Sequence, residues 1–153
     1  MKLTLAAISP GRAKADPAAT LAADYLARAS HYLPCDSHTY PTEAALLAAV
    51  DPKSARQAAR TTPILILLDS RGQQLTSEAF AAHLGRLRDS GAQSLVLAIG
   101  PADGWSPAAH ARASLTLSFG PITLPHQLAR AVLAEQIYRA LTILAGHPYH
   151  SGH

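Results

Sequence analysis

The sequence predicts an α/β protein with a largely parallel sheet. Three apolar runs, at residues 63–69, 94–99 and 114–119, are typical of strands buried on both faces. Segments of helical periodicity separate them and are long enough to cross back over a sheet. The chain has 153 residues, 48% of them apolar, which is enough to bury a hydrophobic core without disulfides or metal. We therefore expect a single domain over residues 1–153.

The first quarter of the chain predicts a strand and a helix. KLTLAAI at residues 2–8 is too short in its apolar part for a secretory signal and is expected to be the first strand. A polar loop rich in helix breakers, residues 10–17, follows it. From about residue 18 to 31 the apolar side chains recur at helical spacing: Leu21, Tyr25, Leu26 and Ala29.

The second quarter predicts a weak edge strand and a helix. CDSHTY at residues 35–40 is flanked by prolines, which favour sheet edges. The helix over residues 41–50 is expected to carry Pro41 and Glu43 in its first turn, where an acidic side chain complements the helix dipole. A polar segment, residues 51–62, then leads to the first of the three apolar runs.

The second half alternates strands with helices. After the 63–69 strand, a helix is expected to begin at Thr76 or Ser77 and to end before Gly91. Ser106 and Pro107, after the 94–99 strand, are typical of an N-cap and first helical turn, and predict a short helix.

The last helix is predicted over residues 126–145, after the 114–119 strand. Its apolar residues cover one broad face, wider than the stripe of about 100° that packs against one sheet. Gly146 and Pro148 are the expected stop signals. Either a second chain covers the excess apolar surface, or another segment of the same chain does.

In parallel sheets, ligands bind outside the carboxyl ends of the strands. Here those ends are residues 68–72, 100–104 and 120–125, and all three are rich in Gly or Pro. Three such loops at one sheet edge predict a pocket with mostly backbone contacts, although Gly and Pro also serve simply to turn the chain. Asp69 and Asp103 are either polar cofactor contacts or turn residues.

Several function classes have no motif in this sequence. No G-x-G-x-x-G follows a strand, no phosphate-binding P-loop occurs, and the G-x-S-x-G of serine hydrolases is missing. The longest apolar run, residues 64–68, is far too short to span a membrane. Cys35, the single cysteine, fits a reducing compartment, and we expect a cytoplasmic protein.

The charged residues do not indicate binding of free nucleic acid by charge alone. The net charge is +3 and the pI is about 9.3, but no basic stripe is visible. If the substrate is nucleic acid, shape or a large preassembled partner must supply much of the recognition. His147, His150 and His153 lie on a tail beyond the last helix, without a nearby Cys or Glu, so no metal site is expected.

Two arginines on the last helix are candidates for function. Arg139 follows Glu135 by four residues, which predicts an ion pair on the helix surface. Arg130 has no acidic residue four positions later and is freer to meet a substrate or a partner chain.

The C-terminal third carries an ordered set of motifs. These are LPHQLAR at 124–130, LAEQIYRA at 133–140 and G-x-P-Y-H at 146–150. LLDSRGQQLTSEAFA at 67–81 and IGPADGWS at 99–106 precede them in order. The chain thereby resembles the bacterial ribosomal large-subunit methyltransferase H family of the SPOUT superfamily.

The resemblance implies a fold and an activity. Members of this family transfer a methyl group from S-adenosylmethionine to N3 of a pseudouridine in 23S ribosomal RNA and act as homodimers. Their fold is a largely parallel sheet with helices on both faces, in which the C-terminal segment forms a deep trefoil knot. We expect the same here, with the assembled ribosome as substrate and no membrane or metal partner.

The resemblance also implies site residues. It places the methyl donor against three strand-end loops, through Leu68, Gly100, Pro101, Gly120, Pro121, Ile122, Thr123, Leu124 and Pro125. These are the loops that the strand pattern indicates independently. For the RNA side, the candidates are Tyr149, His150, Arg130 and His126, and the family's closing pair Tyr149-His150 is favoured as the substrate contact. The acceptor N3 is an imide nitrogen that keeps its proton at neutral pH, so its methylation needs a base or a group that stabilises the anion. His126 is alternatively only a cap of the last helix.

Two positions depart from the family pattern. Pro101 replaces a second glycine and removes a backbone N–H from the donor loop. Ser151 replaces the basic residue that follows Tyr149-His150. A non-catalytic SPOUT protein that binds RNA or ribosomes, with a disabled donor loop, is therefore the second hypothesis. An unrelated α/β hydrolase or ligand-binding module is the third.

Overall fold

The computed structural model describes residues 1–11, 15–51 and 61–151, and within them five strands form one parallel sheet. The strands are β1 (Lys2–Ile8), β2 (Cys35–Tyr40), β3 (Ile64–Gln74), β4 (Ser94–Ile99) and β5 (Leu115–Ser118). The helices are α1 (Pro17–Ala29), α2 (Glu43–Val50), α3 (Ser77–Asp89), α4 (Pro107–Arg112) and α5 (His126–Leu144), followed by a 3₁₀ turn at Pro148–His150. The strand order is β2-β1-β4-β3-β5, with every neighbouring pair parallel.

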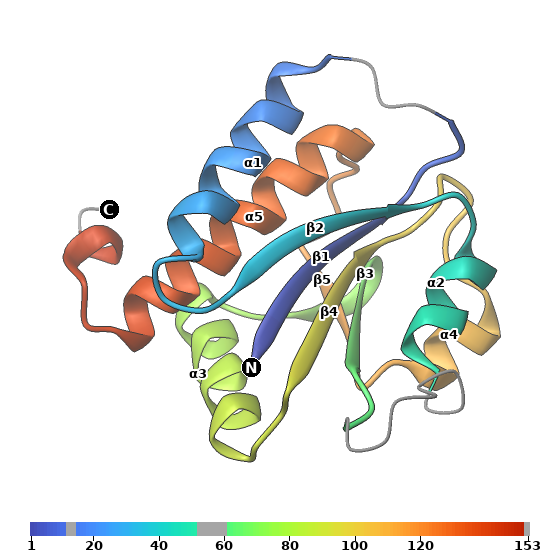
Figure 1. Cartoon of the computed structure of the whole chain (residues 1–153). Helices are drawn as coiled ribbons and strands as arrows, with labels where there is room; N and C mark the ends of the chain where they lie inside the picture. Colours follow the sequence, from blue (N-terminus) through green and yellow to red (C-terminus); the bar gives the residue numbers. More distant parts are fainter. Residues whose placement is uncertain (12–14, 52–60, 152–153) are drawn as a thin grey trace.

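Helices cover both faces of the sheet (Figure 1). Alternate residues of β4 point to opposite sides: Leu95 and Leu97 join one core cluster, and Val96 and Ala98 join the other. The first core contains buried residues of α1, α3 and α5, and the second contains those of α2 and α4. The predicted α/β class and parallel sheet are therefore confirmed. The continuous apolar runs of the sequence arise because strands covered on both faces need apolar residues at every position.

Most of the predicted helices and strands are present, and they begin and end within a few residues of the predicted bounds. The expected caps Thr76 and Ser106 each accept a hydrogen bond from the backbone N–H three residues later. CDSHTY is the edge strand β2. The polar segment predicted over residues 51–62 falls mostly outside the described residues.

Two predictions at element ends were wrong. Pro41 precedes the N-cap Thr42 and is therefore not in the first turn of α2. β3 continues five residues beyond Asp69, whereas Ser70–Gly72 was predicted to end it.

The extra length of β3 comes from a bulge. β3 pairs with β5 in one register up to Leu68 and in another from Gln73, so residues 69–72 are inserted between the two. Gly72 packs so closely on β5 that a Cβ would lie 2.7 Å from the carbonyl carbon of Leu117. Glycine is therefore required at this position, and the close contact fixes the bulge against the sheet.

The long helix α5 packs chiefly against α1 and α3. Much of its broad apolar face is therefore covered by other segments of the same chain, which was one of the two alternatives for this surface. Leu128 remains 43% exposed. No helix in the described ranges is long and apolar enough to cross a membrane.

Candidate functional site

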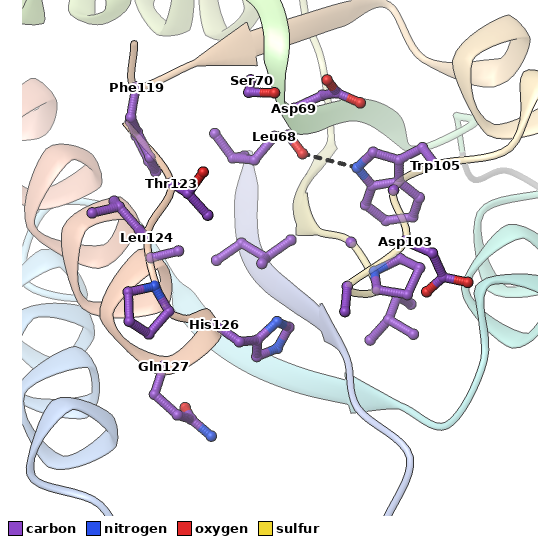
Figure 2. A pocket seen from close by; sticks show the side chains of 18 of the residues that line it. Leu68, Asp69, Ser70, Asp103, Trp105, Phe119, Thr123, Leu124, His126 and Gln127 are labelled. Carbon is purple, nitrogen blue, oxygen red and sulfur yellow. Dashed lines mark hydrogen bonds between the residues drawn. The ribbon is translucent and has the colours of Figure 1, made fainter. Parts of the chain in front are cut away.

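A cleft of about 940 Å³ lies at the carboxyl ends of the strands (Figure 2). Its walls come from the end of β1, residues 68–71 in the middle of β3, the loops after β4 and β5, and the start of α5. Pockets of roughly 300–1,000 Å³ hold small molecules and cofactors, so this cleft is at the upper end of that range. The edge of the sheet that the sequence predicted as a binding site therefore carries a cleft.

Eight of the nine predicted donor contacts line this cleft. They are Leu68, Gly100, Pro101, Gly120, Ile122, Thr123, Leu124 and Pro125. Pro121 is the exception: it belongs to the loop after β5 but is not among the residues that line the cleft. The convergence follows from the parallel pairing of β3 with both β4 and β5, which brings the three loops to one edge.

Trp105 joins two of the three loops. Its indole Nε1 donates a hydrogen bond to the carbonyl of Leu68, 2.9 Å away, and the side chain is 7% exposed (Figure 2). A Cβ on Gly100 would lie 2.7 Å from the indole ring. Gly100 therefore lets the backbone of the loop after β4 lie directly on the ring, and the ring fixes that loop to β3 at Leu68, just before the bulge.

A second contact fixes the loop after β4 from the other side. The carboxylate of Glu43 accepts hydrogen bonds from the backbone N–H of Ser106, at 3.1 Å, and from the Ser106 hydroxyl. The same hydroxyl caps α4 through the backbone N–H of Ala109. Within this loop, the N–H of Gly104 donates to the carbonyl of Pro101 at 3.0 Å, so Pro101 is accommodated in a turn.

Ser118 anchors the loop after β5. Ser118 is 6% exposed, and its hydroxyl donates a hydrogen bond to the carbonyl of Ser70 in the bulge, 3.1 Å away. The backbone N–H of Gly120 donates to the same hydroxyl at 3.0 Å. Gly120 has a φ of +104°, a conformation that side chains with a Cβ rarely adopt. The bulge of β3 and the start of this loop therefore hold one another in place.

Asp69 lies in the bulge with its side chain 6% exposed. Its carboxylate accepts the backbone N–H of Arg71 at 2.9 Å and two guanidinium N–H groups at 3.1 Å each. The hydrogen bonds from Arg71 hold the pKa of Asp69 below its usual value. Asp69 is thus both a turn residue and part of the cleft wall, whereas Asp103 is an exposed residue of that wall.

His126 is the one RNA-side candidate that lines the cleft. It is the first residue of α5, and the structure shows no side-chain cap there, so the capping alternative is not supported. Its Nε2 is buried without a hydrogen-bond partner among the described residues. Burial, and secondarily the charge of Arg130, lowers the pKa of His126 from its ordinary value of 6.5. The imidazole is therefore neutral at pH 7.

Arg130 lies one turn after His126 but does not line the cleft. Its Nη1 donates to the side chain of Gln127 at 3.3 Å, and its Nε is buried without a partner among the described residues. The prediction that Arg130 lacks an acidic partner on α5 agrees with this geometry.

The tail residues Tyr149 and His150 do not line the cleft. The Tyr149 hydroxyl donates to Glu135 at 3.1 Å, and its ring packs edge-on against Tyr138, 4.7 Å between centroids. Arg139 forms the predicted ion pair with Glu135 at 2.7 Å. Burial, with the hydroxyl of Tyr25 and the charge of Glu135, raises the pKa of Tyr149, so the phenol stays protonated at neutral pH.

His126 and Tyr149 lie at different places along α5. His126 is the first residue of this helix of 19 residues, and Tyr149 packs against Glu135 and Tyr138 at and beyond its midpoint. From His126 to Glu135, at 1.5 Å per residue, the helix rises by about 14 Å. One chain therefore places His126 in the cleft and its own Tyr149 farther along α5, outside the lining of the cleft.

Some residues of the cleft wall were not predicted from the sequence. Ile8, Ser9 and Pro10 line the cleft, because β1 is paired with β4 and ends at the same edge. Ligands bind at the carboxyl ends of parallel strands, and this applies to β1 as well. The sequence alone does not show that β1 lies inside the sheet, between β2 and β4. Trp105 had a signal too, since it is the single tryptophan of the chain and directly follows a predicted loop.

Comparison with known proteins decides the family. A family model described as "Predicted SPOUT methyltransferase" matches residues 1–150. The chain belongs to the SPOUT methyltransferase family. It is 47% identical over 143 residues to the ribosomal RNA large subunit methyltransferase H of Koribacter versatilis, covering 94% of each protein. It is 62% identical over 87 residues to the protein of the same name from Rhizobium meliloti, covering 57% of this chain and 54% of that protein.

Solved structures share this SPOUT fold. The SpoU methyltransferase AviRb from Streptomyces viridochromogenes, in complex with its cofactor AdoMet, superposes with a TM-score of 0.55 at 16% identity. That match covers 95% of this chain and 59% of AviRb. A probable methylase family protein from Haemophilus influenzae gives a TM-score of 0.54 at 9% identity, covering 96% of this chain and 69% of that one. At these identities, the likeness concerns the fold.

The titration of His126 tests the electrostatics of the cleft. Replacing Arg130 with Met removes a positive charge beside the ring and is expected to raise the pKa of His126, while burial keeps it below the ordinary value of 6.5. Two-dimensional NMR of the imidazole nitrogens between pH 4 and 8 measures both values. His83 is the internal control, because its charged neighbour is Arg86 and its pKa should not change. An unchanged or lower pKa of His126 in the variant would contradict this description.

Proposed function

We propose that this chain transfers the methyl group of S-adenosylmethionine to large-subunit ribosomal RNA, at N3 of a pseudouridine in 23S RNA. The observation that carries the proposal is the cleft itself. Three loops far apart in the sequence meet there, and eight of the nine donor contacts implied by the family resemblance line it. Family membership and the name shared by the Koribacter and Rhizobium relatives support the same reaction class.

The residues of the cleft fit the proposed donor. Ile122 and Leu124 supply apolar surface for the adenosine moiety. A Cβ at Gly120 would meet no heavy atom within 4 Å, so the space beside this glycine is open to a ligand. When bound, the donor supplies a methyl group that is already electrophilic because it is attached to a sulfonium. The protein then has mainly to align donor and acceptor.

The acceptor nitrogen must lose its proton, and His126 is the base that we propose. It lines the cleft, is neutral at pH 7, and its buried Nε2 has no partner among the described residues. Tyr149 is unsuited to this step, because its hydroxyl donates to Glu135 and its raised pKa keeps it protonated. In this scheme the N3 proton passes to the imidazole of His126, the new N–CH₃ bond forms, and the S–CH₃ bond breaks with its electron pair left on the sulfur.

The activity test uses purified protein, donor labelled in its methyl group, and ribosomes from a strain that lacks this methylation. We expect label in 23S RNA, and far more with whole ribosomes than with free RNA because the chain has no basic stripe. Gly120→Val is the matched control: a branched side chain disfavours positive φ and fills the open space, so it should weaken donor binding.

The same experiment separates the second hypothesis. A non-catalytic RNA-binding protein would leave the ribosomal RNA unlabelled while still binding ribosomes, and calorimetry would find no donor uptake. The turn at Pro101 favours the enzyme, because the loop closes with an internal hydrogen bond despite the proline. Unlabelled RNA in the presence of a folded protein would refute the proposed reaction.

We further propose that the chain acts as a homodimer in which the tail of one copy serves the cleft of the other. Within one chain, Tyr149 is held against Glu135 and Tyr138 and does not line the cleft, so the tail does not reach the cleft of its own chain without moving. Leu21 and Leu128 are exposed apolar side chains outside the cleft, at 46% and 43%, and a second copy would cover such surface. The two helices that carry Leu21 and Leu128, α1 and α5, pack side by side (Figure 1).

Complementation between two inactive variants tests this arrangement. One variant ends after Gly146 and lacks the tail, and the other carries Gly120→Val in an otherwise complete chain. We expect each to be inactive alone and the mixture to regain part of the activity, because a mixed dimer combines an intact cleft with an intact tail. Donor affinity of the truncated variant, within a few-fold of the full chain by calorimetry, controls for folding.

If the mixture were as inactive as its components, or if sedimentation showed only a 16 kDa species, the shared site would be wrong. If the truncated variant kept its turnover, the tail would be dispensable, and the RNA-side role would fall to His126 and Arg130.

We also propose that residues 1–153 form one SPOUT domain whose C-terminal segment is threaded as a trefoil knot. The family match over residues 1–150 supports both statements. Tracing the backbone from β5 to α5 in an experimental electron-density map decides between a threaded and an open path.

A further inference from the structure

Arg71 carries the one cationic side chain of Arg or Lys type among the described residues that line the cleft. Its side chain is 75% exposed. The other basic side chains that the structure describes do not line the cleft: Lys2 pairs with Asp36, Arg28 with Asp24, Arg88 with Asp89, and Arg139 with Glu135. Arg112 donates to the carbonyls of Val50 and Pro63, Arg86 contacts His83, and Arg130 donates to Gln127 beside the cleft. Among the described residues that line the cleft, Arg71 therefore supplies the one Arg or Lys charge.

The guanidinium of Arg71 is held in a fixed position. Asp69 accepts its Nε–H and one Nη2–H in a two-pronged contact, both at 3.1 Å, and also accepts the backbone N–H of Arg71. The next residue, Gly72, is packed on the backbone of Thr116 and Leu117. The bulge thus fixes both ends of the ion pair, and little side-chain entropy remains to be lost when the guanidinium binds a ligand.

The ion pair presents its positive side to solvent. The Asp69 side chain is 6% exposed and that of Arg71 is 75% exposed, so the carboxylate is buried behind the guanidinium. His110 lies on the protein side, its Nε2 3.6 Å from Asp69 Oδ2. Of the five N–H donors of an arginine, Asp69 takes two, and three have no acceptor among the described residues. A planar fork of free donors suits an oxyanion.

We propose that Arg71 binds an oxyanion of a ligand in this cleft, and that Asp69 is the positioning residue that orients it. Two oxyanions belong to the proposed reaction: the carboxylate on the methionine moiety of the donor, and a phosphate of the RNA acceptor. The inference rests on the proposed function for the identity of these ligands. The geometry of Arg71 and Asp69 stands without it.

The test compares Arg71→Met with Arg88→Met by calorimetry. Arg88 is a matched control, because it is an exposed arginine paired with an aspartate and does not line the cleft. The two probes are S-adenosylhomocysteine, which has the carboxylate, and 5′-methylthioadenosine, which lacks it. If the carboxylate is the partner, Arg71→Met weakens S-adenosylhomocysteine roughly tenfold, the usual effect of losing a hydrogen bond to a charged group, and leaves methylthioadenosine unchanged.

If a phosphate is the partner, both probes bind as they do to the unmodified chain, and the change is seen with RNA. Co-sedimentation with ribosomes then weakens several-fold for Arg71→Met, and the slope of log affinity against log salt falls by about one. In either case Arg71→Lys gives a partial loss, because lysine keeps the charge without the fork. Asp69→Asn weakens the same ligand as Arg71→Met.

Two results would overturn the inference. In the first, Arg71→Met binds both probes and ribosomes as tightly as Arg88→Met does. In the second, Arg71→Met weakens S-adenosylhomocysteine and methylthioadenosine equally, which would mean that the substitution distorts the cleft. All of these readouts are binding measurements. A failure of methyl transfer in the activity test is therefore distinguishable from a failure of this inference.

Discussion

The parallel pairing of β3 with both β4 and β5 is the constraint on which the rest of the structure depends. It brings three loops from distant parts of the chain to one edge of the sheet. Each loop is then tied to its neighbour by a specific contact: the indole of Trp105 to the carbonyl of Leu68, and the hydroxyl of Ser118 to the bulge of β3. Because these contacts are made by protein groups alone, the cleft is formed before any ligand arrives. A preformed cleft lowers the entropic cost of aligning two substrates.

The bulge at residues 69–72 has two roles. Its backbone anchors the loop after β5 through Ser118, and its side chains place a fixed guanidinium at the cleft. A plain strand would provide neither, since regular pairing leaves no residue free to turn outward. In the sequence, the bulge shows itself as Gly72, because only glycine can lie so close to the backbone of Leu117.

Local patterns predicted the elements well, and long-range packing accounts for what they missed. Strand cores such as Ser94–Ile99 and caps such as Thr76 depend on neighbours in sequence, so they were predictable. The extension of β3 was not, because Ser70–Gly72 has the composition of a turn and is held in the sheet only by β5. Likewise, the donor contacts came from strand ends and the resemblance, but the contribution of Ile8–Pro10 needed the strand order. The position of Tyr149 needed the path of the chain beyond α5, which no local signal gives.

The function proposed here depends on the cleft being the donor site. The direct measurement is a crystal structure of the chain with S-adenosylhomocysteine. We expect the ligand between Leu68, the Gly100–Pro101 turn and residues 120–125, with its sulfur open toward His126. Density for the ligand at another surface, or a cleft that stays free of ligand at saturating concentration, would contradict this assignment.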